Sequence, residues 1–422
     1  QAFIDRFSRW YTPAVIVLAL VTWILTQDVV LALTLLVIGC PGALVISIPV
    51  AIVAGIGRAA RNGILIKGGE FLETSARISA VAVDKTGTLT EGRPRLTDVV
   101  VLGEGTDRTE VLRWAAAAEA GSEHPLARPI LDSAQEAGVA PAGIPGHVTP
   151  VPGKGIMSDV GDQRVLIGNP TLLAQYDVTD DVGAGPAARG LAAAGKTPMI
   201  VAVDSTVIGV IAVADQVRPD APAMVDRLHE AGVRKVVMLT GDSRLVAESI
   251  GATTGIDEIH AALLPEDKLE VVARLQREGH TVAMVGDGVN DAPALATADI
   301  GVAMGAAGSA VAVETADIAL MGDHLMKLPE SISLARRTVS VMRQNIAIAL
   351  ITVVLLLAGV FAGGVTMSAG MLVHEASVLL VILNAMRLMR NDSHSTAMAK
   401  EARAPSHHRD FEATEGSPSV GV

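Results

Sequence analysis

The heptapeptide Asp84-Lys85-Thr86-Gly87-Thr88-Leu89-Thr90 places a carboxylate directly after an apolar run, Ile78 to Val83. The apolar run predicts a buried strand, and ligands of an open α/β sheet bind beyond the carboxyl ends of its parallel strands. Gly87 and the threonines offer backbone amides and hydroxyls to a phosphoryl group. We therefore predict that Asp84 is a nucleophile that attacks phosphorus; the alternative is an ordinary exposed turn after a strand.

Two further polar loops follow apolar runs. Thr240-Gly241-Asp242 comes after Val236 to Leu239, and Gly286-Asp287-Gly288-Val289-Asn290-Asp291 comes after Val282 to Val285. Between these loops lies Lys268, whose charge can neutralise the negative charge that develops during phosphoryl transfer. Each junction alone is ordinary sheet architecture, but their order along the chain indicates one phosphotransfer site.

Asp84 and Asp287 together form a hard oxygen site, which Mg²⁺ prefers when phosphate is a further ligand. These motifs in this order resemble the haloacid dehalogenase type of phosphotransfer domain, and the heptapeptide resembles the phosphorylation signature of P-type ATPases, one branch of that type. The resemblance implies ATP as the phosphoryl donor and Mg²⁺ at Asp84, Thr86 and Asp287. It also implies catalytic roles for Thr240, Gly241, Asp242, Lys268, Asn290 and Asp291.

Apolar residues gather at the two ends of the chain. Hydrophobic residues make up 50% of the sequence and the mean hydropathy is +0.45. The uncharged runs are Pro13 to Gln27, Val29 to Gly57, Ile346 to Val373 and Ser377 to Met386. Because a membrane helix needs about 20 apolar residues, we predict four transmembrane helices in two hairpins, the second split near Gly363-Gly364. A soluble phosphatase or phosphomutase, the rival class, needs no such helices.

The apolar runs are flanked by Arg6, Arg9, Arg58, Arg61, Arg336, Arg337, Arg343, Arg387 and Arg390. If the runs pair as antiparallel hairpins, all of these arginines lie on one side of the membrane. The connecting turns, Thr26 to Asp28 and Gly363 to Ser368, carry no Lys or Arg. The positive-inside rule therefore places the large central region in the cytoplasm. We expect an integral membrane protein of a bacterial plasma membrane.

The central region contains an inserted segment without phosphate motifs. This segment resembles the nucleotide-binding domain of heavy-metal-transporting P-type ATPases, in which a His and a Glu contact adenine and glycines admit the nucleotide. The matching residues here are Glu119, His124, Gly153, Gly155, Gly168 and Asn169. A net charge of −12 and 2% aromatic residues argue against a nucleic-acid partner.

The predicted fold is an α-helical membrane part joined to a cytoplasmic α/β haloacid-dehalogenase-like phosphorylation domain with an inserted α+β nucleotide-binding domain. The expected boundaries are 1–62 for the first hairpin, 63–95 and 208–330 for the phosphorylation domain, 96–207 for the nucleotide-binding domain, 331–390 for the second hairpin and 391–422 for a disordered tail. The tail contains three histidines, so metal binding there is an alternative to a solvated terminus.

The single cysteine lies inside the second apolar run, as Cys40-Pro41-Gly42. Pro41 interrupts the helix and frees carbonyl groups at membrane depth, where broken helices mark ion sites. The tripeptide resembles the Cys-Pro-Cys or Ser-Pro-Cys of heavy-metal pumps, with glycine at the third position. In the fourth run, His374, Glu375 and Ser377 resemble the His-Glu-Gly motif of the divalent-metal branch, with Ala376 replacing a glycine.

A thiolate, an imidazole and a carboxylate form a mixed ligand set, which favours zinc, cadmium or cobalt over copper(I). The resemblance implies ATP-driven export of such a cation through an aspartyl phosphate. Copper(I) transport stays an alternative because Met367 and Met371 lie near the fourth run. A non-pumping membrane protein that binds nucleotide or metal is a further alternative, because the chain lacks the Thr-Gly-Glu tripeptide with which such pumps hydrolyse the aspartyl phosphate. We expect the actuator domain that carries this tripeptide before residue 1 or on a second chain, and slow phosphate release by this chain alone.

Overall fold

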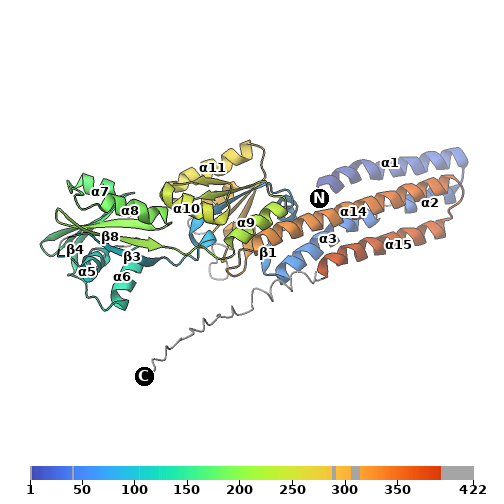
Figure 1. Cartoon of the computed structure of the whole chain (residues 1–422). Helices are drawn as coiled ribbons and strands as arrows, with labels where there is room; N and C mark the ends of the chain where they lie inside the picture. The colour runs from blue at the N-terminus through green and yellow to red at the C-terminus, as the bar shows by residue number, and fades with distance from the viewer. Residues whose placement is uncertain are drawn as a thin grey trace, which may run out of the picture.

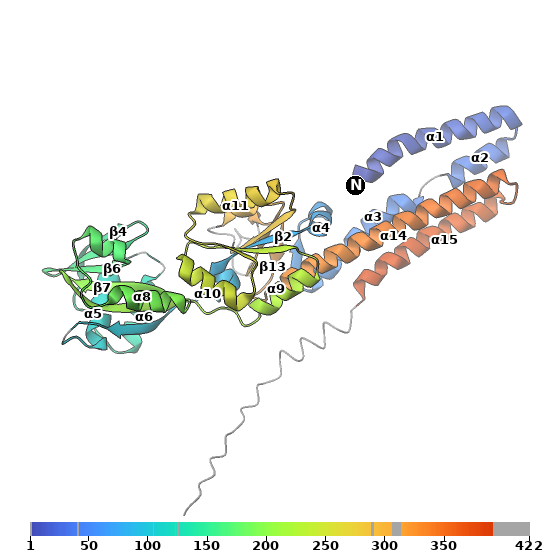
Figure 2. The ribbon, with the colours of Figure 1, turned by 45° about the horizontal axis from the view of Figure 1, so that its top comes forward.

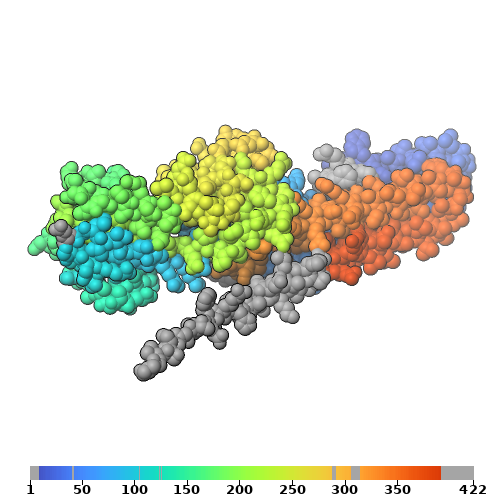
Figure 3. Space-filling model, in the orientation of Figure 1, coloured from blue at the N-terminus to red at the C-terminus, as the bar shows by residue number. Residues whose placement is uncertain are grey.

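The computed structural model describes residues 2–39, 42–103, 105–122, 124, 126–287, 291–305 and 314–390. Three parts follow one another along an elongated molecule: a helical bundle, a central domain with a seven-stranded sheet, and a distal domain with a six-stranded sheet (Figures 1 and 3). The distal domain is an insertion, since the chain leaves the central domain after residue 90 and re-enters it near residue 217.

The central domain contains strands β1 (Ile64–Ile66), β2 (Ala80–Asp84), β9 (Lys235–Leu239), β10 (Glu258–His260), β11 (Val282–Gly286), β12 (Ile300–Ala303) and β13 (Ile318–Leu320). Their order in the sheet is β1-β13-β12-β11-β2-β9-β10, and every pair except β1 with β13 is parallel. Strands β2 and β11 are buried at every position, as expected of a parallel sheet covered on both faces.

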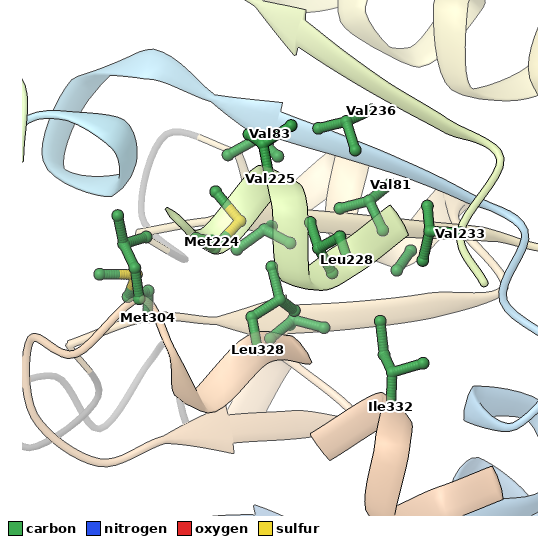
Figure 4. Packing of buried hydrophobic residues seen from close by; sticks show 14 of the residues in the cluster. Val81, Val83, Met224, Val225, Leu228, Val233, Val236, Met304, Leu328 and Ile332 are labelled. Atoms are coloured by element: carbon green, nitrogen blue, oxygen red, sulfur yellow. The ribbon is translucent and has the colours of Figure 1, made fainter. Parts of the chain in front are cut away.

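Alternate residues of these strands pack on opposite faces of the central sheet. Val81 and Val83 of β2 face α9 (Ala221–Glu230), α10 (Arg244–Thr254) and the start of α14 (Lys327–Phe361), as Figure 4 shows in part. Ala80 and Ala82 face α11 (Pro265–Arg277) and α12 (Ala292–Thr297). The short elements α4 (Gly69–Ser75) and η1 (Lys85–Leu89) complete the domain. The sheet is thus fixed from both sides, and its polar loops gather at one edge.

The distal domain is an antiparallel sheet with helices on both faces (Figure 2). Its strands are β3 (Arg95–Val101), β4 (Pro145–Val151), β5 (Gly155–Val160), β6 (Gln163–Gly168), β7 (Thr197–Val203) and β8 (Thr206–Ala214), in the order β3-β8-β7-β6-β5-β4. Helices α5 (Arg108–Glu119) and α6 (Ala127–Glu136) pack on one face, and α7 (Pro170–Gln175) and α8 (Ala184–Ala193) on the other. Most of β8 lies beyond the expected boundary at residue 207.

The helical bundle consists of α1 (Ala2–Thr26), α2 (Val29–Ile38), α3 (Gly42–Arg61), α14, α15 (Met367–Met386) and the short η3 (Arg387–Met389). Within the described residues, four helical segments are long and apolar enough to cross a membrane: 9–26, 29–61, 327–361 and 367–389. This confirms the predicted number of membrane helices. The second segment is interrupted between α2 and α3, where Cys40 and Pro41 lie outside the described residues.

Helix α14 is longer than its apolar run, because it starts in the central domain and continues into the bundle (Figure 1). Arg336, nine residues into α14, joins the helix to the central domain. Its guanidinium donates hydrogen bonds to the carbonyl oxygens of Ile78 at 2.7 Å, Ala231, and Gly232 at 3.3 Å. Ile78 lies just before β2, whose other end carries Asp84.

Candidate active site

Asp84 is the last residue of β2, and β2 lies between β9 and β11 in the sheet. Because Val83 pairs with Met238 on one side and Val285 on the other, the loops after all three strands lie at the same edge. The structure thus brings the three predicted polar loops together around Asp84. The Asp84 side chain is buried, with 6% of the residue's surface exposed.

Lys268 connects two of these loops. Its Nζ atom lies 2.6 Å from Asp84 Oδ1 and 2.7 Å from Asp291 Oδ1. Burial, together with the nearby charge of Asp291, raises the pKa of Asp84 to about 6, although Lys268 opposes the rise. Burial alone would lower the pKa of Lys268, but the two carboxylates outweigh it and raise that pKa. At neutral pH the pair is therefore an ionised carboxylate held by a charged amine.

The loop after Asp84 orients the carboxylate and leaves one side open. Asp84 Oδ2 accepts a hydrogen bond from the Thr86 amide at 2.9 Å, which orients the carboxylate. Gly87 has a φ of +73°, a conformation that glycine adopts without strain. The side of the loop at Thr86 is exposed, so a ligand can approach it.

The second predicted loop is tied to the first by Lys85. Lys85 Nζ lies 2.5 Å from Asp242 Oδ2, and Asp242 in turn donates its amide to Thr240 Oγ1 at 3.1 Å. Thr240 is buried, and Gly241 passes close to the Leu263 carbonyl, which lies 3.3 Å from where a side chain would begin. Lys85 had no role in the sequence interpretation, although it directly follows the predicted nucleophile.

The third loop contributes Asp291, which is buried beside Gly286. A side chain at Gly286 would begin 2.6 Å from Asp291 Oδ2, so the glycine leaves the space that the carboxylate occupies. Asp287 directly follows β11 and is partly buried. Asn290, also predicted to be catalytic, lies outside the described residues.

Two residues that sequence reasoning missed hold the Asp84 loop in place. Asp215 accepts hydrogen bonds from the Thr90 hydroxyl and from the amides of Gly92 at 3.1 Å and Arg93 at 3.0 Å. Arg218 donates to the carbonyls of Gly87, Thr88 and Thr90 at 3.0 to 3.4 Å. A signal existed, since both residues follow the apolar run Val207 to Ala214 as the predicted loops follow theirs.

A cavity of about 970 Å³ extends from the distal domain to the second polar loop. Its lining includes all six residues predicted to bind nucleotide, together with Gly241 and Asp242 of the central domain. The lining is mostly apolar with a few polar groups, as is usual for small-molecule sites. The cavity therefore extends from the predicted adenine-binding residues to the second of the three polar loops.

Glu119 and His124 differ in their surroundings. Glu119 is buried, its Oε2 atom has no hydrogen-bond partner among the described residues, and burial raises the pKa of its carboxyl while Ser122 partly opposes this. His124 is exposed, and its Nδ1 atom accepts the Leu126 amide at 3.2 Å. A neutral His124 ring therefore carries its proton on Nε2 and can donate it to a ligand.

The glycines of the distal cavity are required by the backbone itself. Gly155 and Gly168 pair across β5 and β6, and a side chain on either would begin 2.1 Å from a carbonyl oxygen of the opposite segment. Asn169 caps α7 and donates to the Gly153 carbonyl at 3.0 Å. These contacts hold the cavity wall together through the backbone, without any ligand.

In the bundle, His374 and Ser377 are buried, whereas Glu375 is exposed. The His374 ring lies against Gly42, where a side chain would begin 3.0 Å from Nε2. Its Nδ1 atom has no hydrogen-bond partner among the described residues, and Ser377 donates to the His374 carbonyl at 2.6 Å. The structure thus places His374 next to the residue that follows Cys40-Pro41, while Glu375 points out of the described bundle.

Residues 78–299, just over half of the chain, match the haloacid dehalogenase-like hydrolase family. The chain belongs to this family. The family match covers β2, β9, β11 and the distal domain, and so includes Asp84, Lys268 and the three polar loops.

The haloacid dehalogenase-like part lies within a longer similarity to metal-transporting ATPases. The chain is 41% identical over 406 residues to a probable cadmium-transporting ATPase of Staphylococcus aureus (strain MRSA252), covering 92% of this chain and 55% of that protein. It is 42% identical over 396 residues to a zinc-exporting P-type ATPase of Mycobacterium marinum, covering 92% and 53%. The chain spans about half the length of the curated relatives it matches.

A solved structure extends the similarity to the membrane helices. The crystal structure of a zinc-transporting PIB-type ATPase in the E2.Pi state superposes with a TM-score of 0.74 and 43% identity, covering 92% of this chain and 64% of that one. These findings confirm the predicted relationship to heavy-metal-transporting P-type ATPases and the predicted fold class. With its four candidate spans, this haloacid dehalogenase-like chain is an integral membrane protein.

Proposed function

We propose that the chain is the phosphorylated, ion-conducting part of a pump that uses ATP to export a divalent heavy-metal cation. The observation that supports this most is the position of Lys268, whose amine holds both Asp84 and Asp291 at the edge of the central sheet. The same domain continues through α14 into the membrane bundle. A soluble phosphatase does not need a helix that continues from its catalytic domain into a membrane bundle.

In the proposed reaction an Asp84 carboxylate oxygen attacks the γ-phosphorus of ATP. A new P–O bond to Asp84 forms, the bond to the β,γ-bridging oxygen breaks, and ADP leaves with that electron pair. Lys268 orients the attacking carboxylate through its 2.6 Å contact and offsets charge on the transferring group. Asp215 and Arg218 act as positioning residues, because they bond the Asp84 loop and not the carboxylate itself.

The residues present fit Mg²⁺, which was predicted at Asp84 and Asp287 from their carboxylates and at Thr86 from resemblance. Asp84 and Asp287 lie at the ends of adjacent parallel strands, β2 and β11, so two carboxylates meet at one edge. Oxygen donors of this kind suit a hard cation that also binds phosphate. Bound there, Mg²⁺ would neutralise phosphate charge.

The adenine end of ATP is proposed to occupy the 970 Å³ cavity, with Glu119 and His124 at its base end. Gly153, Gly155, Gly168 and Asn169 form the neighbouring wall. The presence of Gly241 and Asp242 in the same lining supports a path from this cavity toward Asp84.

The transported cation is proposed to bind in the bundle near His374. This imidazole is buried, has an unpartnered Nδ1 among the described residues, and lies against Gly42. Cys40 lies two residues before Gly42 in the sequence, and we propose that it binds the cation together with His374 and Ser377. Glu375 is exposed, which argues against it as a direct ligand. An imidazole with one thiolate favours zinc, cadmium or cobalt over copper(I).

The domain boundaries remain part of the proposal, with the end of the nucleotide-binding domain moved from residue 207 to the end of β8. The cytoplasmic position of the central and distal domains is also proposed, as is ATP with Mg²⁺ as the cofactor pair. The lipid bilayer is the proposed environment of the bundle, and we expect no nucleic-acid partner. An actuator domain is expected to supply the hydrolysis of the aspartyl phosphate.

A phosphorylation assay across a panel of metals tests the proposal. Membranes containing the chain are incubated with ATP labelled at the γ-phosphate and Mg²⁺, with zinc, cadmium, cobalt or copper(I) added in turn. We expect an acid-stable, hydroxylamine-sensitive label that needs Asp84. Label that persists in Asp84→Asn would overturn the assignment, and stimulation by copper(I) alone would overturn the divalent-metal part.

A further inference from the structure

A second cavity, of about 560 Å³, lies at the end of the bundle that faces the central domain. It is bounded by the end of α3, the first half of α14 and the residues that follow α15. These segments are far apart in sequence but side by side in the structure (Figures 1 and 2). The cavity shares no lining residue with the proposed nucleotide cavity.

The cavity is basic. Arg58, Arg337, Arg387 and Arg390 line it, and Glu330 is the one acidic residue in its lining. Helices α3 and α15 end nearby, and each C-terminus adds a partial charge of about −0.5. The four guanidinium groups carry a charge of +4, whereas the carboxylate and the two helix ends together carry about −2. The net charge of about +2 favours binding of an anion there.

One face of α14 forms the longest wall of the cavity. Glu330, Ser333, Arg337, Ser340 and Gln344 follow one another at spacings of three or four residues, so they lie along one stripe of the helix. At the first residue of this stripe, Glu330 accepts a hydrogen bond from Asn62. The stripe offers hydroxyl and amide groups beside the arginines, a suitable combination for phosphate oxygens.

The position of the cavity matches the boundary between membrane and water. In α14 the uncharged run begins at Ile346, two residues after the lining residue Gln344. Arg387 directly follows α15, at the end of the fourth apolar run. Leu334, Val341 and Leu388 add apolar surface to the same cavity. A ligand there meets charge on one side and hydrocarbon on the other.

We propose that this cavity binds the phosphate headgroup of an anionic glycerophospholipid. Guanidinium groups bind phosphate oxygens in a paired geometry, and basic pockets between membrane helices on the cytoplasmic side attract anionic headgroups. The apolar lining accommodates the glycerol end of the acyl chains, which a free phosphate ion lacks. Because the lining comes from α3, α14 and the residues that follow α15, the bound lipid bridges the two helices beside the proposed ion site to the helix that enters the central domain.

Native mass spectrometry of the whole chain in non-ionic detergent tests this proposal. The chain is titrated with phosphatidylglycerol, with phosphatidylcholine, or with phosphatidylglycerol in the presence of excess inorganic phosphate. The test variant combines Arg387→Gln and Arg390→Gln. The matched control combines Arg9→Gln and Arg343→Gln, which remove the same charge from the same end of the bundle but do not line the cavity.

We expect phosphatidylglycerol to bind the wild-type chain and the control alike, and to bind the test variant roughly 10- to 30-fold more weakly. Phosphatidylcholine should bind weakly throughout, and inorganic phosphate should not displace the lipid. Equal losses in test and control variants would reduce the effect to general surface charge and overturn the proposal. Displacement by inorganic phosphate would overturn the lipid assignment. If the double variant fails to fold, the single change Arg390→Gln, at an exposed residue, decides the matter by the same titration.

Discussion

Lys268 Nζ lies 2.6 Å from Asp84 Oδ1 and 2.7 Å from Asp291 Oδ1, so one amine separates two buried carboxylates. Without it, the two negative charges would face each other in a desolvated site. The arrangement makes Asp84 both available as a nucleophile and costly to keep ionised, since burial raises its pKa to about 6. Stability and chemistry at this position should therefore respond to pH together.

Asp84→Asn should abolish the phosphoenzyme and stabilise the fold above pH 6. The pKa of Asp84 rises from 3.8 to about 6 on folding. The ionised carboxylate therefore lowers the free energy of unfolding by about 3 kcal/mol at any pH where it is ionised in both the folded and the unfolded state. That cost is full above pH 6 and absent below pH 4, where the carboxyl is protonated in both states. Thermal melting in EDTA from pH 4 to 8 should show the variant gaining over the wild type as pH rises. A constant difference across this range would contradict the prediction.

Lys268→Met should be strongly destabilising, because it leaves Asp84 and Asp291 buried without a positive partner. Removing one member of a buried ion pair costs about 3–5 kcal/mol. The pKa of Asp84 should rise further, and phosphoenzyme formation should move to higher pH. Chemical denaturation and the pH profile of labelling measure the two effects. Lys235→Met is a control, since Lys235 pairs with Glu258 in a more exposed position and should lose about 1 kcal/mol or less.

His124→Ala should weaken ATP binding about tenfold while leaving labelling at saturating ATP nearly unchanged, because the ring lines the distal cavity and is part of no contact at Asp84. Isothermal titration calorimetry gives the affinity, and labelling gives the chemistry. The control is His147→Ala, at an exposed position on β4 outside the cavity lining. Equal affinities for wild type and His124→Ala would remove His124 from the nucleotide site.

Gly168→Ala should destabilise the distal domain by several kcal/mol even without nucleotide, because the added carbon would begin 2.1 Å from the Lys154 carbonyl oxygen. Gly190→Ala, in α8 and with open space at that position, should instead stabilise it by about 0.5–1 kcal/mol. Melting temperatures of both variants without nucleotide check the contrast. Normal stability of Gly168→Ala combined with lost ATP binding would assign the glycine to the ligand alone.

Gly42→Ala should impair the metal response, because the new methyl group would begin 3.0 Å from His374 Nε2 and push the ring aside. We expect the zinc concentration for half-maximal labelling to rise about tenfold, a change worth about 1.4 kcal/mol of binding. Gly57→Ala, also in α3 but with open space around it, should behave as the wild type. An unchanged zinc response in Gly42→Ala would move the ion site away from His374.

The central site could be predicted from the sequence because its strands are continuous apolar runs that end in polar residues, a local pattern. Strands β2, β9 and β11 and the loops after them follow this pattern. Asp215 and Arg218 also follow an apolar run, but this position alone does not mark them as part of the site. Their contacts are with Thr90 and Gly87, more than 120 residues away, and a local pattern does not record such contacts.

The bundle site could be predicted less well, because the rotation of a membrane helix depends on its neighbours and not on its own apolar run. His374 and Glu375 are about 100° apart on α15, so only packing decides which one faces inward. The structure buries His374 and exposes Glu375. In the distal domain, Gly155 and Gly168 were interpreted through resemblance as nucleotide contacts. The close pairing of β5 and β6 gives a steric reason for glycine at both positions.

The 35 residues of α14 form an uninterrupted helix about 52 Å long, and Arg336 fastens its near end to the backbone of the central domain. Such a helix behaves as a rigid rod, and its attachment at Arg336 lies beside Ile78, at the end of β2 opposite Asp84. A tilt of about 5° at Arg336 would carry Phe361, about 38 Å further along the helix, sideways by roughly 3 Å, which is more than half the pitch of a helical turn. A tilt of a few degrees where α14 meets the central domain is therefore transmitted to the far end of the bundle without any bending of the helix.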